Sequence, residues 1–517
     1  MKNKLFPEYL KNISQKETEF FEYKNNHILG KIGPNFNCFN EVTIELLSYA
    51  IVNILKSKNL DIKLLIANDG LSKYASFFEK KIANIISYYT QKIYCFKNHT
   101  PVSEAFFKYT NLITESFGMI IYFHKFSEDN KFAISFFNKN NDPLSEEIIK
   151  EIIKEYKKIN INDNKNTTND LNFLNFDKLL KEYTDFLIKK NFTKDANHLL
   201  NIGIIYSSLQ NTFIKKILGK NDIAYKVFKK NFKKDKPLLI NFSFFYFKSL
   251  KNIDYIIKFS YDYKKLYLYK RNYSKKTSLC FELVDITDLI CNYLSFTNTI
   301  LNTNRNFSPI KKIYSNNLVK KEYILSIASY FKLDFQINWL FRPNLINDEN
   351  SIYFDEENNV YLFNSKKIGY DAFSFFTVLI DMLNYYKTQG MKYEDICSQN
   401  LSFIDQLKIT EFEIHCIKEN VINFETKLFI QDNISLIKVN SIENVKEYYK
   451  NEFQKYIAKF NFEQSEWMSI KYDFKNEKLI FLVCETKKTN GNLAKKIKKY
   501  MKKFTKKYNK PLIKLGD

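Results

Sequence analysis

Two segments of the chain carry side chains that suggest phosphoryl chemistry. His124 follows the apolar run 118–123, and an imidazole can accept a phosphoryl group where a partner orients the ring and cations hold the phosphate. The loop 260–266 follows another apolar run, and its single carboxylate, Asp262, stands close to two lysines. Because Mg²⁺ prefers several oxygen ligands in near-octahedral order, this loop is not expected to bind a metal.

The surroundings of His124 favour a packing role over catalysis. Tyr122, Phe123 and Phe126 place aromatic rings around it. The remaining histidines show no spacing typical of a catalytic triad or a metal site; they are residues 27, 99, 198 and 415. The cysteines form no C-x-x-C pair and are expected to be small buried apolar residues; they are residues 38, 95, 280, 291, 397, 416 and 484.

Strand-like and helix-like segments alternate in the part of the chain that contains His124. Helical periodicity covers 43–58 and 73–89. Short apolar runs bounded by turn residues predict strands at 62–67, 92–96 and 118–123. Such alternation is typical of an α/β domain with a largely parallel sheet, and the last of these strands would deliver His124.

The segment 118–134 resembles the phosphoserine loop of the α-D-phosphohexomutases, the phosphoglucomutase and phosphomannomutase family. That loop reads roughly G-[VL]-[MI]-I-T-A-S-H-N-P-x-E-x-N-G-[YF]-K-[VI], and its serine carries the phosphoryl group that is exchanged with the sugar. In this chain His124 stands at the serine position. The resemblance covers nearly the whole chain and implies three α/β domains with mixed sheets, followed by a smaller C-terminal α+β domain.

The resemblance also divides the chain into four expected domains. They contain, in order, the counterparts of the phosphoserine loop, the metal loop, the sugar loop and the phosphate-binding loop. A polar run at 157–170 separates the first domain from the second. The expected ranges are 1–160, 171–300, 301–420 and 421–517.

The metal loop of the family reads D-x-D-x-D-R-L, and its three carboxylates clamp one Mg²⁺. At these positions the chain has Ser260, Asp262 and Lys264, so the resemblance implies that the metal is lost. An arginine of the family that holds substrate phosphate is replaced by Leu29, which has no guanidinium group. No metal and no cofactor are therefore expected.

The sugar loop is the best-preserved polar match. The family pattern F-G-F-E-E-S-x-G-Y places Glu356 and Glu357 at the two glutamates that contact sugar hydroxyls. Phe354 and Val360 fill the two glycine positions, which predicts a changed loop shape. An exposed acidic turn is an equally good interpretation of the two glutamates.

The phosphate-binding loop of the family falls at 471–478, where Glu477 would repel a dianion. Phosphoryl transfer depends on positioning and on cations around the moving phosphate. Losing one such group typically costs on the order of 10²- to 10³-fold in rate. Since the nucleophile, the metal loop and the phosphate loop have all changed, no useful mutase activity is expected.

The net charge of +23 comes from a lysine-rich composition that is typical of an AT-rich genome, such as that of a wall-less bacterium. Residues 493–508 predict a basic amphipathic helix that packs by its apolar stripe, with a weak contact to an acidic surface as the alternative. Its aromatic residues form no stacking platform, so no specific nucleic-acid partner is expected. No run of about 18 uncharged apolar residues and no signal-peptide core occur, so we expect no transmembrane segment and a cytoplasmic location.

Together these features predict a catalytically inactive, phosphohexomutase-like pseudoenzyme. We expect it to act as a structural or scaffolding subunit of a larger assembly, such as cytoskeletal or motility machinery, with other proteins or copies of itself as partners. Two alternatives stay open. One is a module that binds sugar phosphates, and the other is a phosphoglucomutase or phosphomannomutase with altered chemistry.

Overall fold

The structure is a computed structural model of the 517-residue chain. The residues that it describes are 20–24, 26–58, 63–90, 92–114, 118–126, 131–159, 171–188, 200–205, 211–220, 223–228, 240–242, 252–260, 263–272, 279–300, 309–338, 348, 350–363, 372–401, 407–417, 420–444, 456–463, 465–473, 477–486 and 492–508.

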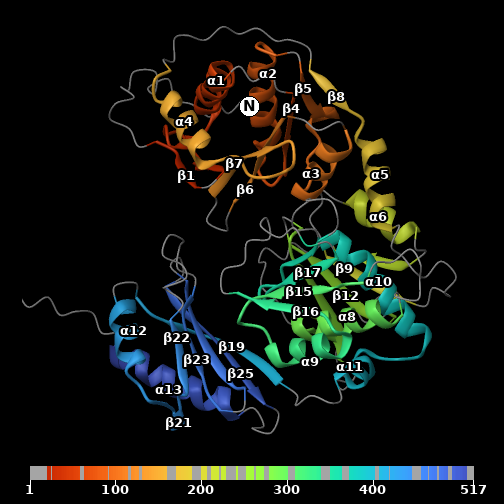
Figure 1. Ribbon diagram of the computed structural model, residues 1–517, viewed down its shortest axis with the longest axis vertical. Coiled ribbons are helices and arrows are strands. Elements are labelled where there is room, and N and C mark those ends of the chain that lie inside the picture. The colour runs from red at the N-terminus through yellow and green to blue at the C-terminus, as the bar shows by residue number, and fades with distance from the viewer. Residues whose placement is uncertain are drawn as a thin grey trace, which may run out of the picture.

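The first domain is built on an eight-stranded sheet (Figure 1). The strand order is β1-β2-β7-β6-β4-β5-β8, with β3 paired to β2. Strand β6 runs parallel to β4 and antiparallel to β7, so the sheet is mixed. The strands are β1 (Glu22–Lys24), β2 (His27–Ile32), β3 (Cys38–Phe39), β4 (Leu64–Asn68), β5 (Ile93–Phe96), β6 (Met119–Lys125), β7 (Lys131–Asn138) and β8 (Asn172–Leu174).

Helices cover both faces of this sheet. Alternate residues of β6 enter different apolar clusters: Ile121 packs with α1, α2 and α4, whereas Ile120 and Tyr122 pack with α3 and α5. Because successive side chains of a strand point to opposite faces, His124 follows Tyr122 onto the α3 side. The helices are α1 (Glu41–Ser57), α2 (Ala75–Ser87), α3 (Glu104–Ile113), α4 (Glu146–Tyr156) and α5 (Phe176–Ile188), with a 3₁₀ turn, η3 (Lys97–His99).

The second and third domains also combine mixed sheets with helices. The second sheet has the order β10-β9-β12-β13-β14-β11 and the third has the order β16-β15-β17-β18. The elements of the second are β9 (Asn201–Ile205), α6 (Asn211–Lys220), β10 (Ala224–Val227), β11 (Ile240–Phe242), β12 (Tyr255–Phe259), β13 (Leu266–Asn272), β14 (Leu279–Leu283) and α8 (Ile286–Thr299). Those of the third are β15 (Lys312–Ser315), α9 (Lys321–Phe331), β16 (Asp334–Ile337), β17 (Ser351–Phe354), β18 (Val360–Phe363), α10 (Ala372–Thr388) and α11 (Tyr393–Leu401).

The fourth domain has an antiparallel sheet with the order β19-β25-β24-β23-β22. The terminal helix α13 packs on it through Leu493, Ile497 and Met501, while its lysines face outward, as its amphipathic pattern predicts. The elements are β19 (Leu407–His415), α12 (Val421–Phe429), β20 (Asn433–Ile434), β21 (Ile437–Lys438), β22 (Ser441–Asn444), β23 (Tyr456–Asn461), β24 (Trp467–Asp473), β25 (Lys478–Thr486) and α13 (Asn492–Tyr508).

The predicted fold class, α/β domains with mixed sheets and a C-terminal α+β domain, is confirmed. Two strands lie outside the ranges expected for their domains. β8 pairs in parallel with β5 of the first sheet although it lies past residue 160. β19 pairs with β25 of the fourth sheet along all nine of its residues although it precedes residue 421.

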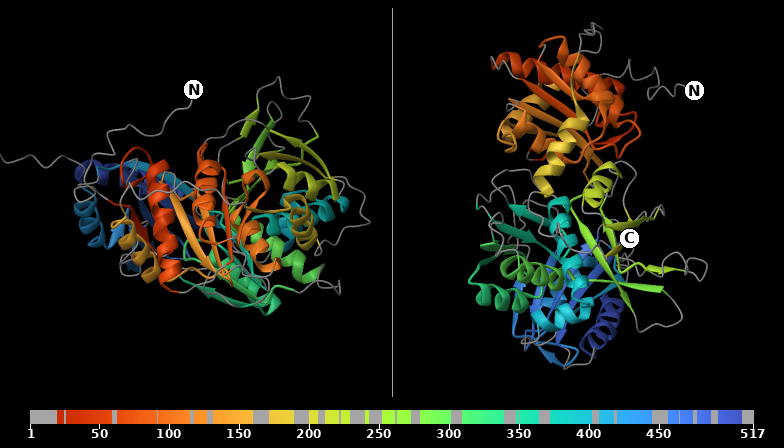
Figure 2. Two further views of the ribbon diagram at one scale, coloured as in Figure 1. Left: turned by 90° about the horizontal axis from the view of Figure 1, so that it is seen from above. Right: turned by 90° about the vertical axis from the view of Figure 1, so that its right-hand side faces the viewer.

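The domains share part of their interior. One apolar cluster runs from the α3 side of the first sheet through the second sheet and into the third. The right-hand view of Figure 2 shows the first domain set above the other three, and Figure 1 labels α5 and α6 where they meet. Among the described residues, no helix has the length and apolar character needed to cross a lipid bilayer.

A buried ion pair links the second and third domains. Lys320, which precedes α9 and is 3% exposed, contacts Asp288 of α8 at 2.8 Å and Asp285 at 3.5 Å. Burial raises the pKa of Asp288 to about 6, against the opposing effect of the Lys320 ammonium. The Lys320 ammonium therefore balances the negative charge of two neighbouring aspartates that are partly shielded from water.

Replacing this lysine should destabilise the protein strongly. Lys320→Met leaves Asp285 and Asp288 without a cation, and removing one partner of a buried pair costs about 3 kcal/mol. Urea unfolding should show a clearly lower midpoint for Lys320→Met. The control is Lys321→Met, at the exposed neighbouring position. Equal midpoints for the two variants would contradict the prediction.

Candidate functional site

His124 lies at the end of β6 rather than on an open loop. It stands opposite Ala133 of β7 and is 9% exposed. Its ring stacks on Tyr122 with 5.2 Å between ring centroids and meets the His27 ring edge-on at 5.9 Å. The ring at the family's phosphoserine position is therefore packed among other rings.

Ser135 joins His124 to His27. Its Oγ lies 2.6 Å from His124 Nε2 and 2.6 Å from His27 Nδ1. The sheet order explains this contact, because β7 lies between β2 and β6 and places Ser135 directly opposite His27. Burial lowers the pKa of His27 to about 3, and His124 adds to this shift, so His27 is neutral near pH 7.

A serine hydroxyl beside an imidazole is the arrangement that activates a nucleophile. Ser135, however, is fully buried, so a substrate has no access to its oxygen. The arrangement therefore acts as a hydrogen-bonded core. Sequence reasoning missed it because His27 and Ser135 are 108 residues apart, and only the strand pairing brings them together.

A carboxylate and two ammonium groups lie next to this core. Glu104 at the start of α3 contacts Lys108 at 2.7 Å and Lys264 of the second domain at 2.9 Å. Burial opposes ionisation of Glu104, but the two lysines and His124 outweigh it and hold its pKa well below the usual value. Lys264 therefore places a cation where the family resemblance puts a metal ligand.

The two ends of the metal loop are hydrogen-bonded to each other. Ser260 is 2% exposed, and its Oγ accepts a hydrogen bond from the Lys265 backbone N–H at 3.0 Å. Its own N–H donates to the Lys265 carbonyl at 3.1 Å. Asp262, the one carboxylate that the sequence offers here, lies outside the described residues.

The sugar loop is a tight turn organised by Asp355. This buried carboxylate accepts hydrogen bonds from the backbone N–H groups of Glu357 and Asn359, at 3.0 and 3.1 Å. Asn358 adopts a φ of 64°, in the left-handed region that asparagine tolerates better than most residues. The turn therefore does without the glycines of the family loop.

Both candidate sugar ligands already have partners within the protein. Glu356 accepts a hydrogen bond from the side-chain amide of Asn316. Glu357 contacts Lys265 of the metal loop and Lys471 of the fourth domain, each at 3.0 Å. A sugar hydroxyl would have to compete with these contacts.

The metal loop and the sugar loop also pair through their backbones. Lys265 and Asn359 form an antiparallel bridge. The N–H of Leu266 donates to the Asn358 carbonyl at 3.3 Å, and that of Val360 donates to the Lys264 carbonyl at 3.4 Å. These backbone bonds join the metal loop, which carries Lys264 and Lys265, to the sugar loop of the third domain.

The two remaining candidate positions lie on or beside strands. Leu29 of β2, at the family's arginine position, is buried opposite Ala133. The expected phosphate loop, 471–478, includes the end of β24 and the first residue of β25, where Asp473 pairs with Lys478. Residues 474–476 lie outside the described residues.

Ion pairs thus connect the four domains in sequence. Glu104 of the first domain pairs with Lys264 of the second, whose neighbour Lys265 pairs with Glu357 of the third. Glu357 in turn pairs with Lys471 of the fourth. We call these three contacts the interdomain ion pairs. They use charged groups of the protein itself where a phosphosugar site would need groups for its ligand.

The His27–Ser135 contact predicts a measurable pH dependence. The unfolded chain protonates His27 below about pH 6.5, whereas the folded protein resists protonation down to about pH 3. Acidification should therefore cost the native protein stability. In His27→Gln this cost should be smaller by about 1–2 kcal/mol between about pH 7 and pH 5.

The measurement is urea unfolding of wild type and variant at both pH values. Glutamine keeps an amide that can reach Ser135. The control is His415→Gln, at an exposed position of β19. If wild type and His27→Gln lose the same stability on acidification, His27 is not held neutral in the folded protein.

Comparison with known proteins points to one fold. No protein-family model matches the chain, and no curated protein matches it in sequence. A protein designated a phosphomannomutase, from Thermus thermophilus, has a TM-score of 0.62 at 9% identity and matches over 95% of this chain and 100% of its own. A phosphoglucomutase/phosphomannomutase family protein from Burkholderia thailandensis has a TM-score of 0.59 at 9% identity, over 96% and 99% of the two chains.

A third similar structure is the open form of parafusin, a phosphoglucomutase from Paramecium. Its TM-score is 0.62 at 11% identity, over 96% of this chain and 98% of its own. Identities this low show likeness of fold alone, and the match extends over nearly the full length of every chain compared. The chain therefore has the fold of the α-D-phosphohexomutases, as the resemblance of its loops predicted.

Proposed function

We propose that this chain is a non-catalytic protein of phosphohexomutase fold that serves as a structural subunit of a larger protein assembly, such as cytoskeletal or motility machinery. The observation that carries the proposal is the set of interdomain ion pairs. They pair Lys264, Lys265, Glu357 and Lys471, which are charged residues of the candidate loops, with one another or with Glu104 of α3. A ligand or a metal would have to break them before it could bind.

The chemistry of the nucleophile supports the same conclusion. A phosphoryl acceptor needs a free nitrogen that faces the donor, with cations around the phosphate. His124 Nε2 contacts Ser135, and Nδ1 lies 3.1 Å from the Lys125 carbonyl. Of the nearby cations, Lys264 and Lys108 are both paired with Glu104. Phosphorylation of His124 would require these contacts to reorganise together.

The positive charge of Lys264 in the metal loop also supports the proposal of a non-catalytic protein. A mutase metal neutralises charge on the transferring phosphoryl group. Lys264 is held by Glu104, and its ammonium lies beside a carboxylate that stays ionised. A divalent cation placed beside this ammonium would be repelled. The protein thus stabilises this region with an internal cation.

A structural role fits the preserved fold. The first three domains share an apolar interior, and ion pairs join the third domain to the second and the fourth. Fold alone does not determine function, and a protein joined in this way can present new surfaces to partner proteins.

The catalytic alternative is tested by phosphorylation. The protein is incubated with glucose 1,6-bisphosphate and Mg²⁺, and its intact mass is measured at neutral pH, because phosphohistidine is labile in acid. We expect no added phosphate and no conversion of glucose 1-phosphate above the buffer background. A known phosphoglucomutase serves as the positive control. Added phosphate that disappears in His124→Gln would overturn the proposal in favour of altered chemistry.

The binding alternative is tested by thermal stabilisation. A ligand that binds only the folded state at 100 times its Kd stabilises it by about 2.7 kcal/mol. We expect glucose 1-phosphate to leave the melting temperature unchanged in the wild type, in Glu356→Ala and in Glu357→Gln. Stabilisation of the wild type that vanishes in Glu356→Ala would instead establish a sugar-phosphate module.

The structural role itself is tested in the native cell. The endogenous protein should elute from size exclusion far above its 61.9 kDa chain mass and should co-purify with the same partners at fixed ratios. Elution as a monomer after gentle lysis, with no such partners, would contradict a role as an assembly subunit.

A further inference from the structure

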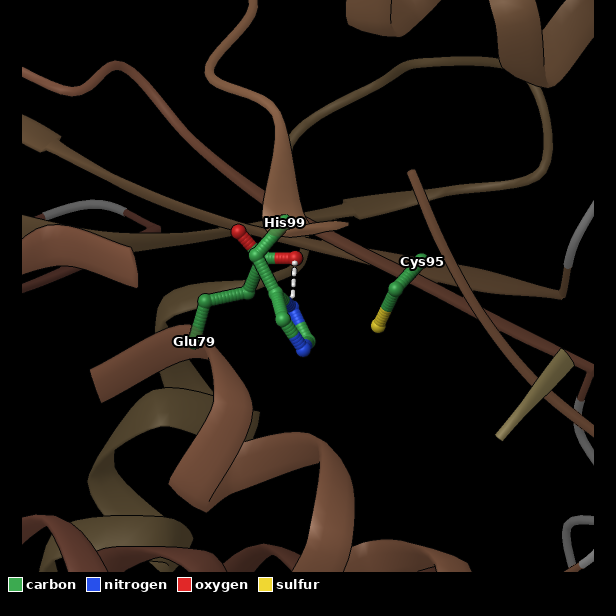
Figure 3. Close-up of side chains that lie close together, drawn as sticks. All are labelled: Glu79, Cys95 and His99. Atoms are coloured by element: carbon green, nitrogen blue, oxygen red, sulfur yellow. Dashed lines mark hydrogen bonds and ion pairs between the residues drawn. The ribbon is translucent and has the colours of Figure 1, made fainter. Parts of the chain in front are cut away.

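A second group of chemically active side chains lies in the first domain, away from the candidate loops. Glu79 of α2, Cys95 of β5 and His99 of η3 each offer one ligand atom, and these atoms all lie within 4.8 Å of one another (Figure 3). Within the described part of the chain, this is the one such group of three metal-ligating side chains. We call it the Glu79 cluster.

The three side chains come from different elements and converge on one point. Figure 3 shows Glu79 and His99 side by side, with the Cys95 sulfur directed toward the imidazole. Glu79 is 1% exposed, Cys95 is fully buried, and the His99 side chain is 11% exposed. The cluster is therefore interior, and His99 is its most exposed member.

The backbone around His99 is held in an unusual shape. Asn98 and His99 both adopt left-handed conformations, with φ of 57° and 50°. Each such residue costs about 1 kcal/mol or more when it is not glycine, so surrounding contacts must maintain the turn. The turn directs the His99 ring to Glu79, whose Oε1 lies 2.8 Å from Nδ1.

A second residue orients the carboxylate. The side-chain amide of Asn68, at the end of β4, donates a hydrogen bond to the other oxygen of Glu79. The Asn68 oxygen accepts from the Gly70 N–H at 2.8 Å, which fixes the amide orientation. Glu79 is thus presented with one oxygen anchored and the other directed toward His99.

The charges of the cluster favour a divalent cation. One thiolate and one carboxylate together balance the charge of a divalent ion, and a coordinated thiol is deprotonated outright.

We propose that Glu79, Cys95 and His99 bind a zinc ion, with water in the fourth position. Zn²⁺ accepts this combination of sulfur, nitrogen and oxygen ligands at about 2.0–2.3 Å, so tetrahedral ligand atoms lie roughly 3.5 Å apart. In the structure the three ligand atoms lie within 4.8 Å of one another, so a bound ion would draw them closer together. Asn68 is the positioning residue that orients the carboxylate ligand.

The ion would connect α2, β5 and η3 in the interior of the first domain. This site is separate from the metal loop of the fold and does not depend on the proposed function. The competing arrangement is a buried Glu79–His99 pair beside an inert thiol. The two differ in metal content and in whether Cys95 is a thiolate.

Metal binding is tested on the full-length chain. After treatment with EDTA, the protein is titrated with Zn²⁺ in competition with a chromophoric chelator, and with Co²⁺ under anaerobic conditions. We expect one Zn²⁺ per chain and a thiolate-to-Co²⁺ charge-transfer band. In Cys95→Ser the band should vanish, and Zn²⁺ affinity should fall by more than the roughly 10- to 100-fold that is typical of losing a positioning residue.

Two further variants keep the outcome interpretable. Cys38→Ser changes a half-buried cysteine of the same domain and should keep both signals. His99→Gln retains a hydrogen-bonding side chain beside Glu79, and it should lose Zn²⁺ while its circular dichroism stays native. Three results would overturn the site: no bound Zn²⁺ in the wild type, a charge-transfer band that persists in Cys95→Ser, or Zn²⁺ binding that is lost in His27→Gln instead.

Discussion

The compensation of interior charge by charge of opposite sign governs how the domains fit together. Glu357 accepts contacts from Lys265 and Lys471, and Glu104 does the same for Lys108 and Lys264. In a chain with a net charge of +23, each of these glutamates lowers the cost of bringing lysines together. The same requirement explains Lys320, which sits between two aspartates where the second and third domains meet.

The backbone of the fold could be predicted from the sequence, because it depends on local patterns. The apolar run that becomes β6 and the amphipathic pattern that becomes α13 are visible in short windows. Solved structures share this fold at only 9–11% identity. The pairing of β8 and β19 could not be predicted, because each of them pairs with a strand that lies far away in the sequence, β5 and β25 respectively.

The candidate site was harder to predict for the same reason. Substitutions such as Lys264 at a metal position are readable one residue at a time, and they indicate which ligands are missing. What replaces those ligands depends on partners in other domains. Glu104 shows no sign in the sequence that it will meet Lys264, and Cys95 and His99 show no sign that a helix will bring Glu79 close to them. Contacts between distant parts of the chain therefore determine which groups meet at these two places.

The hydroxyl of Ser135 has a consequence for the two imidazoles that it joins. It carries one hydrogen, so it can donate to one ring while it accepts from the other. His124 Nδ1 faces the Lys125 carbonyl, which can only accept, so in the neutral ring this nitrogen carries the proton and Nε2 accepts from the Ser135 hydroxyl. The Ser135 oxygen then accepts from His27 Nδ1. A backbone carbonyl of β6 therefore sets the tautomer of a histidine on β2, and nitrogen NMR shifts report that tautomer directly.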